Sequence, residues 1–198
     1  MPIIAMWLKK PLKWIEDRRE NFLATTSERD QLHYAEIALK KDGTILGVSD
    51  IFYHNTGAYD PYGMTVPLNT QTHTVSNYNV PSFYTEIRMV FTNKMVVTPV
   101  RGAGRPQGVY VMERLMDAAA RELKMDPAEF RRKNFVTAFP HQTPVIMCYD
   151  AGDYAAALDK AIEISDYKGF GDRKAASAKQ GKLRGIGFAA GFKNVGFS

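Results

Sequence analysis

The sequence predicts an α+β fold, with mixed or antiparallel sheets and helices packed on one side. Three observations predict it: an alternating apolar pattern that folds back at a glycine turn, a second alternating segment, and an apolar helical stripe that follows it. Hydrophobic residues make up 45% of the 198 residues and charged residues 24%. These proportions are ordinary for globular proteins, so we expect the chain to fold rather than to be disordered.

The first part of the chain is apolar and then charged. Residues 1–8 have the composition of the later part of a buried helix, residues 10–16 that of a short strand, and residues 17–21 that of a charged break. Residues 1–7 are followed by lysines and not by a small-residue cleavage site, so no signal peptide is expected. No segment has the roughly 18 to 20 apolar residues that a membrane span needs.

A β-hairpin is predicted between residues 31 and 53. Residues 31–40 alternate between two faces, and residues 44–53 form the returning strand. Gly43 permits the positive φ that the tight turn between them requires. The next segment, residues 54–82, is rich in proline, glycine and asparagine. It is predicted to be a long loop, of the kind that is functional or ordered against a partner.

A third strand is predicted over residues 83–91, followed by an extended segment over residues 95–99. Helices are expected over residues 106–123, 126–134, 153–165 and, as a basic helix or linker, 172–184. Pro106 suits the first turn of the first of these helices, and Asp126 suits the N-cap of the second. Residues 185–198 are predicted to form a strand and a glycine-rich turn.

The segment between the third strand and the first of these helices combines glycines with arginines. Arg101 and Arg105 flank Gly102, Ala103 and Gly104. Glycines let a backbone approach a ligand, helix N-termini favour anions, and guanidinium groups match phosphate or carboxylate. The segment lacks the spacing of a P-loop or of a dinucleotide fingerprint. These residues therefore leave two interpretations open, an anion site or a tight turn with exposed arginines.

Charge and cysteine content narrow the function classes. The formal net charge is +5, which fits a protein that handles anions and does not require nucleic acid. Cys148 is the only cysteine, which excludes an internal disulfide and a cysteine-based iron–sulfur or zinc site in this chain. We expect it to be a small buried residue. The four histidines lack metal-ligand spacing, so no metal site is predicted.

Several short motifs, in one order and spacing, resemble those of a single family. They lie at residues 13–22, 42–45, 57–59, 100–107, 112–123, 126–129 and 131–135. Each is weak alone, but the linked series covers nearly the whole chain and resembles the large, molybdopterin-binding subunits of molybdenum hydroxylases. That family includes xanthine dehydrogenases, aldehyde oxidases and aerobic carbon monoxide dehydrogenases. The resemblance implies that this α+β chain is a piece of a molybdopterin-binding domain.

The resemblance assigns roles to the glycine loop. It implies that Arg101, Gly102, Ala103 and Gly104 bind the cofactor, with Arg101 as the catalytic residue beside the metal. Gly102 matches the copper-binding cysteine of aerobic carbon monoxide dehydrogenases, and glycine cannot ligate copper, which argues against carbon monoxide as the substrate. Ala103 matches an aromatic residue that stacks on purines in xanthine dehydrogenases. Alanine there disfavours a xanthine-type pocket or leaves room for a bulkier substrate.

Two further positions are implied to line the substrate pocket together with Ala103. Asn69 lies near the position of an arginine that orients purines in xanthine dehydrogenases, and asparagine lacks that charge. Phe197 matches a second aromatic residue that packs on the substrate, although the sequence alone fits a core aromatic equally well. The glutamate base of the family lies outside this chain. We therefore expect the chain to contribute one wall of a site and not to catalyse alone.

The resemblance also implies domains and cofactors. Residues 1–140 are expected to be part of the first molybdopterin-binding subdomain, residues 141–184 a helical connection, and residues 185–198 the start of the second subdomain. The implied cofactor is molybdenum–molybdopterin in its cytosine dinucleotide form. The implied partners are an FAD-binding subunit, a 2Fe-2S subunit, the remainder of the large subunit and a small-molecule substrate. The single cysteine fits a reducing compartment, so we expect a cytoplasmic protein.

The implied activity is hydroxylation of an N-heteroaromatic compound, an aldehyde or a similar small molecule with oxygen derived from water. Two alternatives stay open from the sequence. One is a non-catalytic scaffold or assembly module of the same family. The other is a basic α+β domain that binds nucleic acid, which the modest charge and the scarcity of aromatic residues among the basic ones disfavour.

Overall fold

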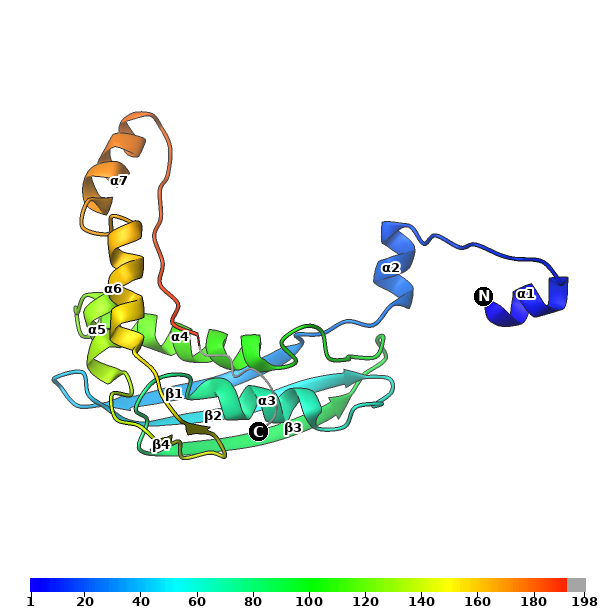
Figure 1. The fold of residues 1–198 in the computed structure, drawn as a ribbon, viewed down its shortest axis with the longest axis horizontal. Helices are drawn as coiled ribbons and strands as arrows, with labels where there is room; N and C mark the ends of the chain where they lie inside the picture. Colours follow the sequence, from blue (N-terminus) through cyan, green and yellow to red (C-terminus); the bar gives the residue numbers. More distant parts are fainter. Residues whose placement is uncertain (192–198) are drawn as a thin grey trace.

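The computed structural model describes residues 1–191, and residues 192–198, which include Phe197, lie outside the described part. Figure 1 shows a body of sheet and helices from which the first two helices extend away. The described elements are α1 (Pro2–Leu8), α2 (Arg18–Ala24), β1 (Gln31–Leu39), β2 (Ile45–Gly57), α3 (Thr65–Thr74), β3 (Phe83–Phe91), α4 (Arg105–Glu122), α5 (Pro127–Asn134), β4 (His141–Gln142), β5 (Cys148–Tyr149), α6 (Tyr154–Ile164) and α7 (Phe170–Lys179). The predicted α+β class is confirmed.

The main sheet is mixed, with its strands in the order β1-β2-β3. β1 and β2 are antiparallel, with Gln31 opposite His54, and β3 runs parallel to β2. A parallel neighbour needs a crossover connection, and α3 lies within it. The predicted hairpin is confirmed. Gly43 has a φ of 85°, and the Thr44 N–H donates to Asp42 Oδ1 at 2.9 Å.

The long helix α4 lies on this sheet against β1 and packs side by side with α3 (Figure 1). Its predicted and observed bounds agree to within one residue, because the apolar stripe is regular. Met112 and Met116 of that stripe are fully buried against Val48 of β2 and Phe130 of α5. Burial of an apolar side chain of this size stabilises a fold by about 1.5–3 kcal/mol. The core therefore fixes α4 on the sheet.

The prediction of a continuous loop over residues 54–82 is wrong in two places. β2 continues to Gly57, and α3 occupies ten residues of the segment. α3 has no apolar stripe, so its periodicity gives no helical signal. Instead, its threonine hydroxyls are satisfied inside the helix: Thr70 Oγ1 donates to the Val66 carbonyl at 3.2 Å, and Thr74 Oγ1 to the Thr70 carbonyl at 2.8 Å. Packing against α4 also stabilises α3, and the sequence pattern of α3 does not indicate this contact.

The N-terminal predictions also need correction. Residues 10–16 form no strand, and residues 17–21 are not a break but the start of α2. A capping box begins that helix, because Asp17 Oδ1 accepts from the Glu20 N–H at 2.8 Å and Glu20 Oε2 accepts from the Asp17 N–H at 2.9 Å. Residues 1–8 are helical as α1, but none of its residues is buried.

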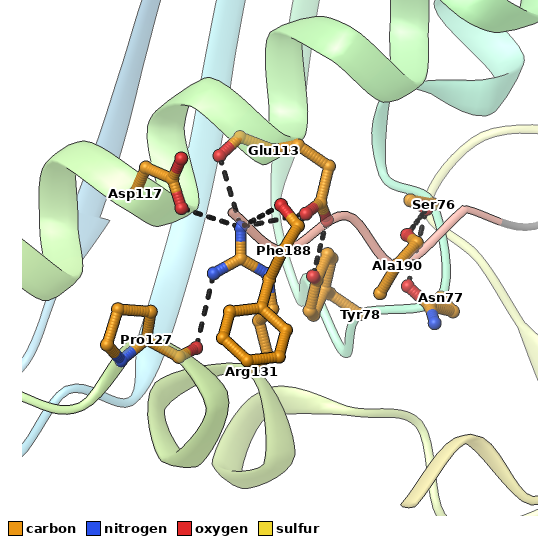
Figure 2. Close-up of polar contacts among 9 residues, drawn as sticks. All are labelled: Ser76, Asn77, Tyr78, Glu113, Asp117, Pro127, Arg131, Phe188 and Ala190. Carbon is orange, nitrogen blue, oxygen red and sulfur yellow. Dashed lines mark hydrogen bonds and ion pairs between the residues drawn. The ribbon is translucent and has the colours of Figure 1, made fainter. Parts of the chain in front are cut away.

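The last described segment, residues 185–191, forms no strand, contrary to the prediction for this part of the chain. It runs as an irregular segment past α4, as Figure 2 shows. Its carbonyl groups hold it there: the Phe188 oxygen accepts from Arg131 Nη2 at 3.3 Å, and the Ala190 oxygen accepts from Ser76 Oγ at 3.1 Å. Cys148, expected to be buried, is exposed.

A buried arginine, Arg131, joins α5 to α4 (Figure 2). Arg131 of α5 is fully buried, and its guanidinium bonds Glu113 Oε2 at 2.8 Å and Asp117 Oδ1 at 2.8 Å, both on α4. Its Nη1 donates to the Pro127 carbonyl at 3.2 Å, and Tyr78 Oη donates to Glu113 Oε1 at 2.5 Å. Each buried charge is thus paired, which removes the desolvation cost of leaving it alone.

Candidate functional site

The glycine loop before α4 has an unusual backbone. Gly102, Ala103 and Gly104 have φ values of 110°, 44° and 91°, three successive residues in the left-handed region. Alanine rarely adopts this conformation, so the flanking structure must hold it there. Short hydrogen bonds do so: the Ala103 N–H donates to the Val100 carbonyl at 2.7 Å, and the Arg105 N–H to the Gly102 carbonyl at 3.1 Å. The loop is therefore a fixed turn.

Glycine is required in this loop by packing. A Cβ on Gly104 would lie 2.1 Å from the Val66 carbonyl oxygen, and one on Gly108 would lie 2.5 Å from the Thr70 carbonyl oxygen. These two glycines, one turn apart, let the start of α4 approach the backbone of α3. From the sequence, the loop glycines fit either a ligand site or a tight turn. For Gly104, the structure shows that the close approach of α3 requires glycine.

Arg101 is the residue that this fixed turn presents outward. Its side chain is exposed, and within residues 1–191 no hydrogen bond or ion pair reaches its guanidinium. Its backbone is held from another part of the chain, because Arg29 Nη2 donates to the Arg101 carbonyl at 3.1 Å. A fixed backbone with free forked donors is an arrangement that can bind an anionic oxygen.

The other loop arginine, Arg105, connects the loop to Asn69. Arg105 Nε donates to His73 Nε2 at 3.2 Å, and His73 Nδ1 lies 2.9 Å from the Asn69 carbonyl oxygen. This pattern requires the tautomer with its proton on Nδ1, because Nε2 accepts. The structure thus brings Asn69 of α3 and the Arg101–Gly104 loop to one end of the α3–α4 pair. His73, which mediates this, was not singled out as a site residue from the sequence.

A buried carboxyl group lies beneath the same loop. The side chain of Glu28 is fully buried, and Arg29 Nη1 lies 3.2 Å from its Oε2. Burial raises the pKa of Glu28, while the backbone N–H groups of Val100 and Gly104 and the Arg29 guanidinium oppose that rise. The Arg29 guanidinium is the ionic partner of this carboxyl group, but neither carboxyl oxygen accepts a hydrogen bond within residues 1–191. The turn therefore lies over a buried acidic group, and both interpretations of the turn, an anion site or a tight turn with exposed arginines, stay open.

Neither Glu28 nor Arg29 was expected near the site. They precede β1, about 70 residues before the loop in the sequence, and no local pattern connects the two segments. The one local signal is an acidic residue directly beside an arginine in the segment that enters the first strand. An isolated parallel bridge between Ser27 and Val97 places that segment beside the loop, and the Ser27 N–H donates to the Val96 carbonyl at 3.2 Å.

A cavity opens beside the loop, between β1 and the first half of α4. Its volume is about 690 Å³. Arg29, Gln31, His33, Ala35, Pro106, Gln107, Tyr110, Val111, Arg114 and Leu115 line it. Within residues 1–191 there is no group of three or more histidine, cysteine, aspartate or glutamate side chains that could hold a metal ion. In the same part of the chain, no helix has the length and apolar character to cross a membrane.

The chain has relatives of known function. Residues 1–135 match the molybdopterin cofactor-binding domain family. The nicotine 6-hydroxylase large subunit of Paenarthrobacter nicotinovorans is 33% identical over 100% of this chain and 25% of its own length. The carbon monoxide dehydrogenase large chain of Hydrogenophaga pseudoflava is 33% identical over 98% of this chain and 25% of its own length.

Solved structures agree. The structure of quinoline 2-oxidoreductase from Pseudomonas putida 86 matches with a TM-score of 0.79 and 30% identity, over 90% of this chain and 23% of that chain. The present chain thus spans about a quarter of the length of these relatives. Fold, motif series and family match lead to one assignment: the chain belongs to the large, molybdopterin-binding subunit family of the molybdenum hydroxylases.

Proposed function

We propose that this chain supplies one wall of a molybdenum–molybdopterin site in a longer hydroxylase subunit. In this proposal Arg101 faces the cofactor, and Gly102, Ala103 and Gly104 shape the wall beside it. The observation that carries the proposal is the Arg101 guanidinium, exposed on a fixed turn with all its donors free within the described residues. The rest of the site, including a catalytic base, belongs to parts of the subunit outside this chain.

The chemistry of the donors fits the cofactor. A guanidinium presents forked N–H donors that match phosphate and other anionic oxygens, and it stays charged at every physiological pH. Arg29 holds the Arg101 carbonyl, so the loop keeps its shape while the side chain binds. When bound, the cofactor supplies the oxygen-transfer and electron-transfer chemistry. The part of this chain is to position it and to provide a positive charge at a fixed place.

For the substrate, we propose an N-heteroaromatic compound, with an aldehyde or a similar small molecule as the alternative. Two relatives carry the names of N-heteroaromatic compounds, nicotine and quinoline. The small side chain of Ala103 and the uncharged side chain of Asn69 suit contact with such a ring, and we propose Phe197 as a third contact. Carbon monoxide is disfavoured, because Gly102 has no thiol with which to bind copper. The φ of 110° at Gly102 also favours glycine over any residue with a side chain.

The remaining parts of the proposal follow from the family. We propose the cytosine dinucleotide form of the cofactor, partner subunits that carry FAD and 2Fe-2S clusters, and a cytoplasmic location. The domain division at residues 140 and 184 is part of the same proposal. The competing function is a scaffold or assembly module that retains the fold without the cofactor. A free Arg101 favours the enzyme, because a scaffold gives no reason to hold an unpaired arginine on a strained turn.

Metal analysis of the assembled complex tests the proposal. The complete large subunit is produced with the FAD-binding and 2Fe-2S subunits, and molybdenum is measured per complex. We expect about one molybdenum per complex for the wild type. Arg101→Gln should lower molybdenum content severalfold, because a cation that holds the cofactor is lost. Arg121→Gln, which removes an exposed arginine near the other end of α4, is the matched control and should leave the content unchanged.

A folded, fully assembled complex without molybdenum would instead support the scaffold. Equal molybdenum in the Arg101→Gln and Arg121→Gln complexes would show that Arg101 is not a cofactor residue. Circular dichroism and gel filtration of each variant separate these results from a failure to fold or to assemble.

A further inference from the structure

The cavity between β1 and α4 lies beside the turn that presents Arg101, is lined by none of the residues 101–104, and has the properties of a ligand site. Its volume of about 690 Å³ falls within the range of about 300–1,000 Å³ that small-molecule sites have. One wall comes from the strand, through alternate residues of β1, and the other from α4. Because both elements are fixed by the core, the cavity is preformed, and a ligand would not have to order its walls.

Most of the lining is apolar. Ala35 extends from β1, and Val111 and Leu115 extend from α4 one turn apart. Tyr110 is 67% exposed on the same helix and lies at the edge of the cavity. Apolar walls with an aromatic ring at the edge suit the faces of a flat, mainly apolar molecule.

The charged residues of the lining are all basic. Arg29 and Arg114 line the cavity, and no carboxylate does. Arg29 is partly used, since its Nη1 pairs with Glu28 at 3.2 Å and its Nη2 bonds the Arg101 carbonyl. Arg114 is exposed, and no ion pair or hydrogen bond reaches its guanidinium from residues 1–191. An apolar cavity whose free charge is a cation is complementary to one anionic group on the ligand.

The polar floor of the cavity is fixed from behind. His33 Nδ1 lies 2.9 Å from Oδ2 of Asp50, whose side chain is fully buried, and His33 Nε2 lies 3.1 Å from Gln31 Oε1. Gln31 Nε2 in turn donates to Thr70 Oγ1 of α3 at 3.0 Å. These bonds hold the His33 ring and the Gln31 amide in one orientation. Binding a ligand against them therefore costs less conformational entropy.

A second observation points to a ligand. Gln107 lines the cavity and is only 9% exposed, yet neither its Oε1 nor its Nε2 has a hydrogen-bond partner within residues 1–191. A buried amide left without partners costs about 1–3 kcal/mol, so such groups are rare unless something else satisfies them. A polar group of a molecule in the cavity, reached by rotation of the terminal amide, would recover this cost.

We infer that this cavity binds a flat, mainly apolar small molecule that bears one carboxylate, with Arg114 as the partner of that carboxylate. The inference does not rest on the proposed function, because it uses no contact with the cofactor. The position of the cavity nevertheless matters to that function. Pro106 and Gln107 follow the Arg101 turn directly, so a molecule bound here lies next to the proposed site wall.

The test compares two ligands of the same shape and two arginines of the same helix. Binding of 2-naphthoate and of 2-naphthamide to the purified chain is titrated by calorimetry and by naphthalene fluorescence. We expect the carboxylate to bind about tenfold more tightly than the amide, as a charge-assisted hydrogen bond provides. Arg114→Gln should abolish this preference and leave amide binding unchanged. Arg121→Gln, outside the cavity on α4, should preserve the preference.

Three results would overturn the inference. The first is equal affinity for the two ligands in the wild type, or binding of neither at millimolar concentration. The second is an equal effect of Arg114→Gln and Arg121→Gln, which would indicate a general charge effect. The third comes from repeating the titration on the complete large subunit: loss of naphthoate binding there would identify the cavity as an internal packing surface. None of these measurements requires molybdenum, so they fail or succeed separately from the proposed function.

Discussion

Two arginines of this chain occupy opposite environments. Arg131 is fully buried, and its donors bond the carboxylates of Glu113 and Asp117 and the backbone carbonyl groups of Glu113, Pro127 and Phe188 (Figure 2). Arg101 is exposed, and no partner reaches its guanidinium from residues 1–191. An arginine whose donors are all used by the protein stabilises the fold. An arginine whose donors are free, on a backbone that the fold holds in place, is available to a ligand.

Arg131 and Arg101 also differ in how their positive charges are balanced. Burial opposes the charge of Arg131, but Glu113, Tyr78 and Asp117 more than compensate and keep its pKa above the ordinary value. The charge of Arg131 is therefore balanced inside the protein. The charge of Arg101 is balanced by nothing within the described residues, and a cofactor with anionic groups would balance it. Stability measurements and ligand measurements should separate the two residues.

Substitution of the buried Arg131 is expected to cause the largest loss of stability. Arg131→Met leaves Glu113 and Asp117 as neighbouring carboxylates on α4, and the buried Glu113 then has the Tyr78 hydroxyl as a hydrogen-bond donor but no cation. Breaking a buried ion pair from one side costs about 3–5 kcal/mol, so we expect the free energy of unfolding to fall by about that amount. Urea unfolding of the purified chain, followed by circular dichroism, measures it.

The control is the double variant Arg131→Met with Glu113→Gln, which also removes the stranded charge. It should be more stable than Arg131→Met alone, because the coupling between paired groups is about 0.5–3 kcal/mol. If the double variant is instead less stable by the sum of the two single effects, the pairing of Arg131 with Glu113 does not contribute to the fold as argued.

The next effect concerns the turn that presents Arg101. In Gly104→Ala the new Cβ would lie 2.1 Å from the Val66 carbonyl, at a φ of 91°. Overpacking of this kind costs about 1–3 kcal/mol, and the strained φ adds to it. We expect a loss of about 2 kcal/mol or more in the free energy of unfolding, with α3 and α4 moved apart.

Gly63→Ala is the matched control for this substitution. Gly63 also has a positive φ, of 55°, but nothing lies within 4 Å of its Cβ position. It therefore has a left-handed backbone without the clash, and its φ is one that alanine adopts with less strain than the φ of 91° at Gly104. Equal losses in the two variants would mean that conformation alone, and not the approach of α3 to α4, requires glycine at position 104.

Much of the fold could be predicted from local pattern. The hairpin around Gly43 and the helix that became α4 were predicted because alternation, a turn residue and an apolar stripe each lie within a few residues. α3 was missed because its stability comes from threonine hydroxyls and from packing on α4, neither of which leaves a periodic signal. The parallel pairing of β3 with β2 was likewise not predicted, because strand partners are chosen by tertiary contacts.

The site was predicted less completely than the fold. The turn at residues 101–104 is visible in the composition, but the sequence could not show that α3 fills the space beside Gly104 or that Glu28 lies beneath the turn. Both contacts join segments far apart in the chain. The resemblance singled out Arg101 as a site residue, but the sequence could not show that Arg131 is fully buried and paired while Arg101 is exposed.

The smallest expected effect is on Arg101 itself. Arg101→Gln removes a side chain that contacts nothing within residues 1–191, and exposed substitutions of this kind change stability by no more than about 0.5 kcal/mol. We therefore expect the urea midpoint of the purified chain to stay at its wild-type value, while Arg131→Met lowers it strongly. A loss of 2 kcal/mol or more would mean that Arg101 stabilises the turn, and its severalfold effect on molybdenum content would then lose its meaning as evidence for cofactor binding. An unchanged midpoint makes that effect specific, because the loop would be intact and only the guanidinium absent.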